Sequence, residues 1–401
     1  MSKIYIVAAK RTAIGKFGGS LSTLSAAEIA AVVIKNILEE TNIDPSKIDE
    51  VIVGNILSAG QKQGVARQAS IKGGIPQEVP AYGVNMICGS GMKAILNAWA
   101  GIKSGEANLV LAGGTETMSG ACYILPASVR NGIKMGDFKA IDHMVLDGLT
   151  DAFADYHMGV TAENIASKYQ ISRTDQDAFS FASQQKAAKA VDAGRFKNEI
   201  VPVSIVNKKE TIVFDTDEFI NRSTSPEKLA TLRPAFAKDG TVTAGNASGI
   251  NDGASFVLVA SEKAVAEYHL TPLAEIVAVG QGGVDPAIMG MGPVPAIGNA
   301  LKKAGMKLTD MDVVELNEAF AAQSLGVMKQ LCIDHQVEPK WFDEHCNLNG
   351  GAIALGHPIG ASGNRITVSL IHEMKRSNAK FGLASLCIGG GMGTAIILKN
   401  C

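Results

Sequence analysis

The chain has 401 residues, of which 46% are hydrophobic, 19% charged and 5% aromatic, and its net charge is −2. This composition excludes a disordered protein, which would be poor in apolar residues, and a short disulfide framework, which would be dense in cysteine. The small net charge gives no basis for a nucleic-acid footprint or a polybasic membrane patch, so small molecules are the expected partners.

The first 120 residues alternate between the patterns of strands and helices. Helices are expected from about Ser25 to Glu39 and after Gly91, and the pattern Ser25-x-x-Glu28 is a capping box. Strands are expected at the β-branched runs 4–8, 51–53 and 109–111. The alternation predicts an α/β fold in which helices cover a sheet.

Residues 120–242 differ in character from the segments on either side. They are richer in charged and amide side chains, and an alanine-rich stretch near 172–191 is typical of an amphipathic helix. A strand expected at 255–260 would return the chain to the first sheet. The sequence therefore predicts a loop domain inserted before the last strand of the first sheet.

An internal repeat indicates that the chain consists of two similar halves. At one constant offset Ile34 matches Ile297 and Asp49 matches Asp312, and each segment has the pattern of a helix, a turn and a strand. A repeat this long indicates a duplicated domain rather than a solenoid. The predicted parts are an N-terminal half at 1–119 and 243–270, the loop domain at 120–242 and a C-terminal half at 271–401.

Two cysteines are candidate reactive groups. Cys88 lies between an expected strand and an expected helix, where a helix N-terminus would lower the pKa of the thiol and make thiolate available at neutral pH. A lone cysteine in an apolar segment is more often a packed core residue. However, Cys387 also ends an expected strand before a glycine turn, and both turns are expected to lead into helices. One thiol could then attack while the other transfers a proton.

His357 and Asn317 are further candidates. His357 lies between Gly356 and Pro358, in a rigid turn that suits a general base, although a buried histidine bonded to backbone is the alternative. Asn317 and Glu318 follow a strand expected at 313–316, where an amide and a carboxylate could orient water or polarise a carbonyl.

Neither a metal site nor a disulfide framework is predicted. Four metal ligands in matched spacing cannot be assembled from the nearby residues Cys332, His335, His345 and Cys346. The six cysteines lack Cys-x-x-Cys pairs, and no signal peptide precedes the first expected strand, so a reducing, cytoplasmic location is expected.

In combination these features resemble the thiolase family, and within it the short-chain subgroup of the biosynthetic type, over essentially the whole chain. The stretches that carry the resemblance include the Cys88 segment and residues 7–12, 112–119, 157–159, 233–236, 246–253, 317–320, 350–363 and 387–393. The resemblance implies a duplicated αβαβα layered fold with two five-stranded halves and an inserted loop domain over the active site. It also implies an acetyl-CoA C-acetyltransferase, which condenses two acetyl-CoA reversibly into acetoacetyl-CoA and CoA.

The resemblance assigns a role to each candidate. Cys88 would accept the acetyl group, with His357 as its base, and Cys387 would remove the α-proton of the second acetyl-CoA. A water held by Asn317 would stabilise the enolate together with His357. Backbone N–H groups of Cys88 and Gly389 would stabilise the carbonyl of the acetyl-enzyme.

For coenzyme A binding the resemblance points to four residues, Ser248, His157, Met158 and Met289. The two methionines would line a small acyl pocket. One motif departs from the family pattern. Relatives often carry Asp-Glu-x-x-Arg, with the arginine near the adenine end of coenzyme A, whereas in this chain three residues separate Glu218 from Arg222. No binding role is therefore assigned to Arg222.

The expected substrates are acetyl-CoA, acetoacetyl-CoA and CoA, with no further cofactor and no nucleic-acid or membrane partner. A homotetramer, a dimer of dimers, is expected, with residues 126–142 as a candidate assembly loop. The first alternative is a 3-ketoacyl-CoA thiolase of fatty-acid breakdown with a broader chain length. A condensing enzyme acting on acyl carrier protein would use two histidines and lack Cys387, and an inactive scaffold would be expected to have lost one of the catalytic residues.

Overall fold

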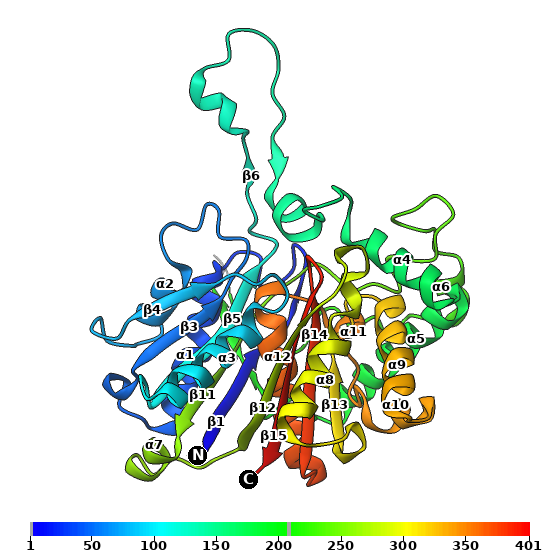
Figure 1. Cartoon of the computed structure of the whole chain (residues 1–401). Coiled ribbons are helices and arrows are strands. Elements are labelled where there is room, and N and C mark those ends of the chain that lie inside the picture. Colours follow the sequence, from blue (N-terminus) through cyan, green and yellow to red (C-terminus); the bar gives the residue numbers. More distant parts are fainter. Residues whose placement is uncertain (1–2, 207–209) are drawn as a thin grey trace.

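Two sheets joined edge to edge organise the fold, which the computed structural model describes for residues 3–206 and 210–401 (Figure 1). In the first sheet β3 is parallel to its neighbours β4 and β5, whereas β11 is antiparallel to β5 and β1. In spatial order this sheet contains β4 (Ala81–Val84), β3 (Glu50–Gly54), β5 (Leu109–Thr117), β11 (Asn251–Ser261) and β1 (Ile4–Thr12).

The second sheet meets the first through a short antiparallel contact at Tyr5–Glu275 and Ile6–Ala274. From that edge it contains β12 (Ala274–Gly283), β15 (Met392–Asn400), β14 (Phe381–Ile388) and β13 (Val313–Leu316). The expectation of five strands in this half is not met among the described residues. Beside β13 lies an isolated bridge between Val314 and Cys346 instead of a fifth strand.

Helices form three layers around the two sheets, so the predicted αβαβα arrangement is confirmed (Figure 1). The outer face of the first sheet is covered by α1 (Ala26–Thr41) and α2 (Val65–Lys72). Between the sheets lie α3 (Ser90–Ser104) and α12 (Ile359–Ser377). The outer face of the second sheet is covered by α8 (Pro293–Ala304) and α9 (Ala321–His335). Each layer boundary is an apolar core, and such burial is the main stabilising term of folding.

The segment between β5 and β11 contains most of the remaining structure. Its elements are β6 (Tyr123–Ile124), η2 (Ala127–Asn131), β7 (Ile141–Asp142), η3 (Met144–Leu149), α4 (Met158–Tyr169), α5 (Arg173–Asp192), β8 (Ile200–Val201), β9 (Val203–Val206), β10 (Thr211–Phe214) and α6 (Pro226–Ala230). The excursion that includes β6 projects away from the rest of the molecule (Figure 1). The exact boundaries of the loop domain stay a prediction.

Short elements complete the chain. They are β2 (Gly15–Lys16), η1 (Pro45–Lys47), α7 (Glu262–Glu267), η4 (Pro286–Met291), η5 (Leu308–Asp310), α10 (Pro339–His345) and α11 (Ala352–Leu355). Within the described part of the chain, none of the helices combines the length and the apolar character that a bilayer crossing requires.

Local sequence patterns predicted several of these elements. Ser25 and Glu28 form the expected capping box at the start of α1, each side chain accepting the other residue's backbone N–H. The repeat is also confirmed, because α1, η1 and β3 in the first half correspond to α8, η5 and β13 in the second. The helix near 172–191 is α5, and it too begins with a capping box, formed by Ser172 and Asp175.

Two expectations about these elements were wrong. The glycine turn after Cys387 leads into β15, which pairs antiparallel with β14, and not into a helix. Helix α5 is not amphipathic in the expected sense, because its buried face is made of small and polar side chains. That face consists of Gln176, Asp177, Ser180, Ser183, Ala187 and Ala190.

Glycines allow the two central helices to begin directly against the first sheet. A Cβ at Gly54 of β3 would overlap the backbone of Ser90 and Gly91, and one at Gly114 of β5 would overlap the carbonyl oxygen of Gly360. The starts of α3 and α12 therefore approach the strands more closely than any side chain permits. This approach fixes the loops before both helices, which contain Cys88 and His357.

We predict that Gly114→Ala destabilises the protein by about 2 kcal/mol, because the added methyl group must push the start of α12 away from β5. Thermal or denaturant unfolding measures the change. Gly101→Ala is the matched control: its Cβ would meet no neighbour, and alanine in helix α3 should stabilise the fold by about 0.5 kcal/mol. Equal stability of the two variants would contradict the proposed close approach.

Candidate active site

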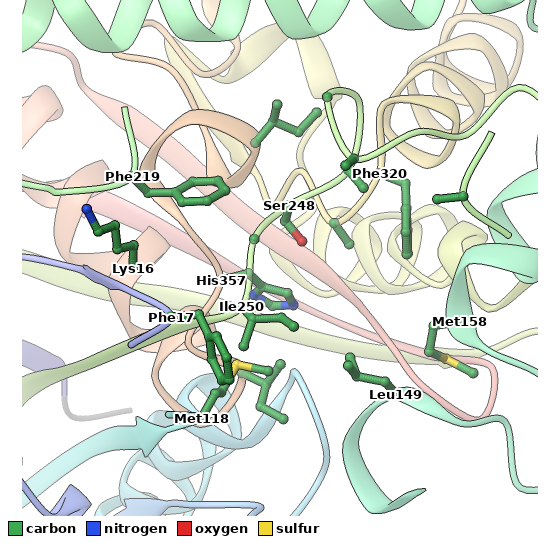
Figure 2. A pocket seen from close by; sticks show the side chains of 18 of the residues that line it. Lys16, Phe17, Met118, Leu149, Met158, Phe219, Ser248, Ile250, Phe320 and His357 are labelled. Atoms are coloured by element: carbon green, nitrogen blue, oxygen red, sulfur yellow. The ribbon is translucent and has the colours of Figure 1, made fainter. Parts of the chain in front are cut away.

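One cavity of about 980 Å³ collects most of the predicted site residues (Figure 2). Seven of the nine line it, namely Cys88, His157, Met158, Ser248, Met289, His357 and Gly389. Of the other two, Asn317 is buried in contact with His357, and Cys387 is fully buried at the end of β14. Residues far apart in the sequence therefore meet as predicted, although their chemical roles stay predictions.

Cys88 sits at the apex of a tight turn between β4 and α3. The preceding residue, Ile87, has φ +45°, a left-handed conformation that is strained for a β-branched side chain. The hydroxyl of Ser90 holds the turn, since it accepts from the N–H of Met86 at 2.8 Å and donates to the carbonyl of Ile87 at 2.7 Å. The next residue, Gly89, has no room for a side chain, because a Cβ would overlap Ile388.

Burial governs the electrostatics of the Cys88 thiol. The pKa of this partly buried thiol is raised to about 11, mainly by desolvation and to a smaller extent by the nearby Glu116, although backbone N–H groups of Gly389 and Cys88 donate to the sulfur and oppose the rise. The expectation of a thiolate at neutral pH is therefore wrong for the resting protein. The loss of water contact outweighs the backbone N–H groups that favour the thiolate.

His357 is held by two polar side chains. Its backbone N–H donates to Oδ1 of Asn251 at 2.9 Å, and its ring Nδ1 lies 2.6 Å from the hydroxyl of Ser362. The carbonyl of Pro358, which can only accept, lies 2.9 Å from that hydroxyl and can take its one proton, and the hydroxyl then accepts from Nδ1. The proton of neutral His357 is thus assigned to Nδ1, and the buried Nε2 is left as an acceptor.

His357 is uncharged at neutral pH. Burial, together with a smaller effect of the nearby Arg365 charge, lowers the pKa of its ring to about 3. Since burial also keeps Cys88 protonated, the resting pair is a thiol and a neutral imidazole rather than a thiolate and an imidazolium. Such a pair avoids the cost of an ion pair in which the imidazolium is buried and the thiolate only partly reached by water.

Asn317 is oriented from behind by Arg365. The guanidinium Nη2 lies 3.4 Å from Oδ1 of Asn317, whose Nδ2 lies 3.5 Å from Nδ1 of His357. Arg365 itself is buried, with the carboxyl group of Glu315 at 3.7 Å; burial raises the pKa of Glu315 to about 8, and the Arg365 charge opposes that rise. The amide nitrogen therefore lies on the side of the histidine, and with the proton on Nδ1 the two groups are in contact without a hydrogen bond.

Glu318, expected to act with Asn317, has a structural position instead. Its carboxylate is buried and accepts from the hydroxyl of Ser183, the amide of Asn347 and the N–H of Ile353. It thus ties α5 to the segment before His357. Among residues 3–206 and 210–401, no group of three or more His, Cys, Asp or Glu side chains is placed to hold a metal ion.

Cys387 lies near enough to Cys88 for the two thiols to influence each other. Burial raises the pKa of the Cys387 thiol, and the Cys88 sulfur raises it further because two adjacent thiolates would repel. Cys387 is therefore protonated at rest and able to donate a proton.

The predicted coenzyme A residues line the same cavity. His157 caps α4 through a bond from the N–H of Gly159 to its Nδ1, and its ring stacks on Phe236 at 4.5 Å. Burial lowers the pKa of His157, so the stacked ring is neutral. In Figure 2 Met158 and Leu149 lie on one side of His357, whereas Lys16 and Phe219 lie on the other.

The displaced Arg222 does not line the cavity, and it pairs with Asp192 through two bonds of 2.7 and 3.0 Å. Asp217, the first residue of the shifted motif, instead binds the buried guanidinium of Arg11 with both oxygens. The motif therefore anchors the loop that carries Phe219 to β1.

Sequence reasoning missed several residues that support the site. They include Asn251, Ser362 and Arg365, which orient His357 and Asn317, and Phe236 and Phe320, which form part of the cavity wall. Ser362 stands five residues after His357 within a stretch already singled out. Its spacing does not reveal the contact, because the backbone changes direction at Pro358 before α12 begins.

Comparisons with known proteins match the whole chain. The model of the thiolase N-terminal domain matches residues 4–263, and that of the thiolase C-terminal domain matches residues 270–400. An acetyl-CoA acetyltransferase of Chromobacterium violaceum is 54% identical over 99% of this chain and 100% of its own length. A second one, of Cupriavidus necator, is 52% identical over 100% of both.

Solved structures agree with these matches. The structure of an acetyl-CoA acetyltransferase from Syntrophomonas wolfei has a TM-score of 0.97 at 41% identity, with 100% of both chains covered. That of human mitochondrial 3-ketoacyl-CoA thiolase has a TM-score of 0.95 at 45% identity, with 100% of this chain and 99% of the other covered.

We predict that alkylation of Cys88 by iodoacetamide accelerates about tenfold per pH unit between about pH 7 and 9, because the raised pKa keeps the reactive thiolate scarce throughout that range. Peptide mass spectrometry would follow the Cys88 adduct, with Cys88→Ala as the control for other thiols. A rate that is already level near pH 7 would indicate a resting thiolate and contradict the neutral pair.

Proposed function

The chain belongs to the thiolase family, and we propose that it is an acetyl-CoA C-acetyltransferase, which condenses two acetyl-CoA reversibly into acetoacetyl-CoA and CoA through an acetyl-Cys88 intermediate. Its full-length similarity to acetyl-CoA acetyltransferases carries the choice of reaction. The meeting of Cys88 and His357 in one cavity supports the mechanism.

In the cleavage direction, the reaction begins with attack on the keto carbon of acetoacetyl-CoA. Nε2 of His357 takes the proton of the Cys88 thiol as Sγ forms its bond to carbon, so no buried thiolate has to exist beforehand. The backbone N–H groups of Cys88 and Gly389 point at the sulfur, and in this mechanism they would stabilise the oxygen of the adduct, as the family resemblance implies.

The carbon–carbon bond then breaks and leaves an enolate of acetyl-CoA. His357 is now protonated on Nε2, so it is a donor at the step in which the enolate oxygen requires one. The N–H groups of Asn317 supply a second donor through a water, as the family resemblance implies. Cys387 gives its proton to the enolate carbon, and its raised pKa ensures that the thiol carries that proton at neutral pH.

Free CoA completes the cycle. Its thiol returns a proton to Cys387, and the resulting CoA thiolate attacks the acetyl group on Cys88. His357 then gives its proton back to the Cys88 sulfur, so all protons balance. Condensation is the same sequence in reverse. Only acetyl groups and protons move, and we therefore propose that no cofactor is needed besides the CoA thioesters.

We predict fast thiolysis of acetoacetyl-CoA and little of 3-ketohexadecanoyl-CoA, followed by loss of the absorbance of the 3-ketoacyl thioester. Cys88→Ala and Cys387→Ala should each lower kcat by at least about a thousandfold, because one removes the nucleophile and the other the proton donor. Preference for the long substrate would instead assign the chain to fatty-acid breakdown, and undiminished activity of either variant would contradict the mechanism.

We also propose a homotetramer, a dimer of dimers, in the cytoplasm. The projecting excursion between β6 and β7 supports the assembly, since it exposes large apolar side chains such as Met135 at 96% and Phe138 at 50%. Exposed apolar clusters of this kind are typical of protein interfaces. Six cysteines without disulfides support a reducing compartment.

The double substitution Met135→Asp and Phe138→Asp is expected to convert tetramers into dimers, because each buried carboxylate would be costly at an interface. Light scattering coupled to size exclusion measures the mass. Val206→Asp, at an apolar residue that is 79% exposed on β9, is the matched control and should leave the tetramer intact. Unchanged mass of the double variant would refute this assembly role.

A further inference from the structure

One buried carboxyl group near Cys88 has no part in the proposed mechanism. Glu116 lies near the end of β5, on the face that contacts α12, and its side chain is fully buried. It does not line the cavity, and within residues 3–206 and 210–401 no cationic side chain forms an ion pair with it. A buried carboxyl group without a counter-ion is costly, so Glu116 is a candidate for a functional role.

Four N–H groups converge on this carboxyl group, two on each oxygen. Oε1 accepts from the backbone N–H of Leu57 at 3.1 Å and from the side-chain amide of Asn55 at 2.9 Å. Oε2 accepts from the backbone N–H groups of Ile56 at 3.1 Å and Gly360 at 3.0 Å. A carboxylate can accept all four bonds, whereas a carboxylic acid would have to place its own proton against one of these donors.

The four donors assign the ionised form of Glu116. Burial raises its pKa to about 8, and the backbone N–H groups oppose this rise. The amide of Asn55 is oriented by a second bond, which it donates to the carbonyl of Thr115 at 3.2 Å. None of the four partners therefore offers an acceptor for a proton, and the carboxylate is the form that fits this geometry.

The donors come from two segments that flank the reactive pair. Gly360 follows His357 by three residues, in the first turn of α12, where a Cβ would lie 2.7 Å from Oε2 of the carboxylate. The other two backbone donors follow β3 and belong to the apolar cluster against which Cys88 packs. The carboxylate thus joins the segment that carries the histidine to the surface that supports the cysteine.

We propose that Glu116 is a positioning residue for acyl transfer, which holds His357 and Cys88 at the separation over which the thiol proton passes to Nε2. The proposal rests on the proposed function and adds to it a residue outside the cavity. A displacement of about 1 Å can lower a rate by about a hundredfold. Loss of this carboxylate should therefore slow the chemical step and leave substrate binding nearly unchanged.

The test follows acylation of Cys88 by p-nitrophenyl acetate, a donor that needs no coenzyme A site, through release of p-nitrophenolate. In Glu116→Gln two of the four N–H groups face an amide NH₂ group, so the acylation rate should fall about a hundredfold. Thr115→Val is the matched control, because it removes a buried bond of 2.8 Å to the carbonyl of Ala26 on the other face of β5. It should lower the melting temperature and keep the wild-type acylation rate.

A double-mutant cycle separates positioning from a general loss of stability. In the His357→Ala background, Glu116→Gln should lower the acylation rate by less than about twofold, since the histidine that it positions is already gone. If Glu116→Gln does not fold, Asn55→Ala removes one of the four donors and should slow acylation about fivefold, again only when His357 is present. An equal fall in both backgrounds, or an unchanged rate with His357 present, would overturn the proposal.

The full reaction distinguishes this proposal from the proposed function. For Glu116→Gln, kcat for thiolysis of acetoacetyl-CoA should fall about a hundredfold, with KM within about twofold of the wild type. If the wild type reacts with p-nitrophenyl acetate but cleaves no acetoacetyl-CoA, the proposed function fails and the acylation rates still decide the role of Glu116. A wild type that is not acylated at Cys88 would overturn both.

Discussion

The exclusion of charge from a buried site is the constraint on which the chemistry depends. Cys88, Cys387 and His357 are ionisable groups, and burial holds all three in their neutral forms. A neutral thiol beside a neutral imidazole can pass its proton as it attacks, and the imidazolium so formed is then the donor that an enolate needs. The same loss of water contact that keeps Cys88 from ionising also keeps the proton on Cys387 until the enolate, a stronger base, takes it. The desolvation of these groups therefore sets their protonation states in both halves of the catalytic cycle.

The fold creates this burial by placing the starts of two helices against one sheet. Glycines at 54 and 114 let α3 and α12 begin in direct contact with β3 and β5, and the loops before these helices hold Cys88 and His357. Duplication supplies the second thiol, because β14 of the other half ends beside the first. Behind the cavity, the buried pair of Arg365 and Glu315 orients Asn317 and keeps positive charge near His357. Such a pair is costly to bury, so we expect it to position Asn317 rather than to stabilise the fold.

Capping boxes, strand patterns and the repeat are local signals, and they predicted the alternating elements and the two halves. The αβαβα layers and the coenzyme A residues were implied only by the resemblance to the thiolase family. Sequence reasoning failed where the outcome depends on distant segments. The pKa of Cys88 was expected to be low from its helix N-terminus, but the surrounding chain that buries it cannot be read from its neighbours in sequence. The turn after Cys387 looks like that after Cys88, yet it enters β15 because that strand pairs with β12 and β14. The buried polar face of α5 serves Glu318, a partner 135 positions away from Ser183.

Difference infrared spectroscopy of the S–H stretch tests the central claim most directly, because the band exists only for a protonated thiol. The account predicts a band at neutral pH that is absent from Cys88→Ala and that disappears from the wild type when acetyl-CoA converts Cys88 to its acetyl thioester. Absence of a Cys88 band in the resting protein would show a thiolate and contradict the neutral pair. A band that persists with acetyl-CoA would contradict the acetyl-Cys88 intermediate.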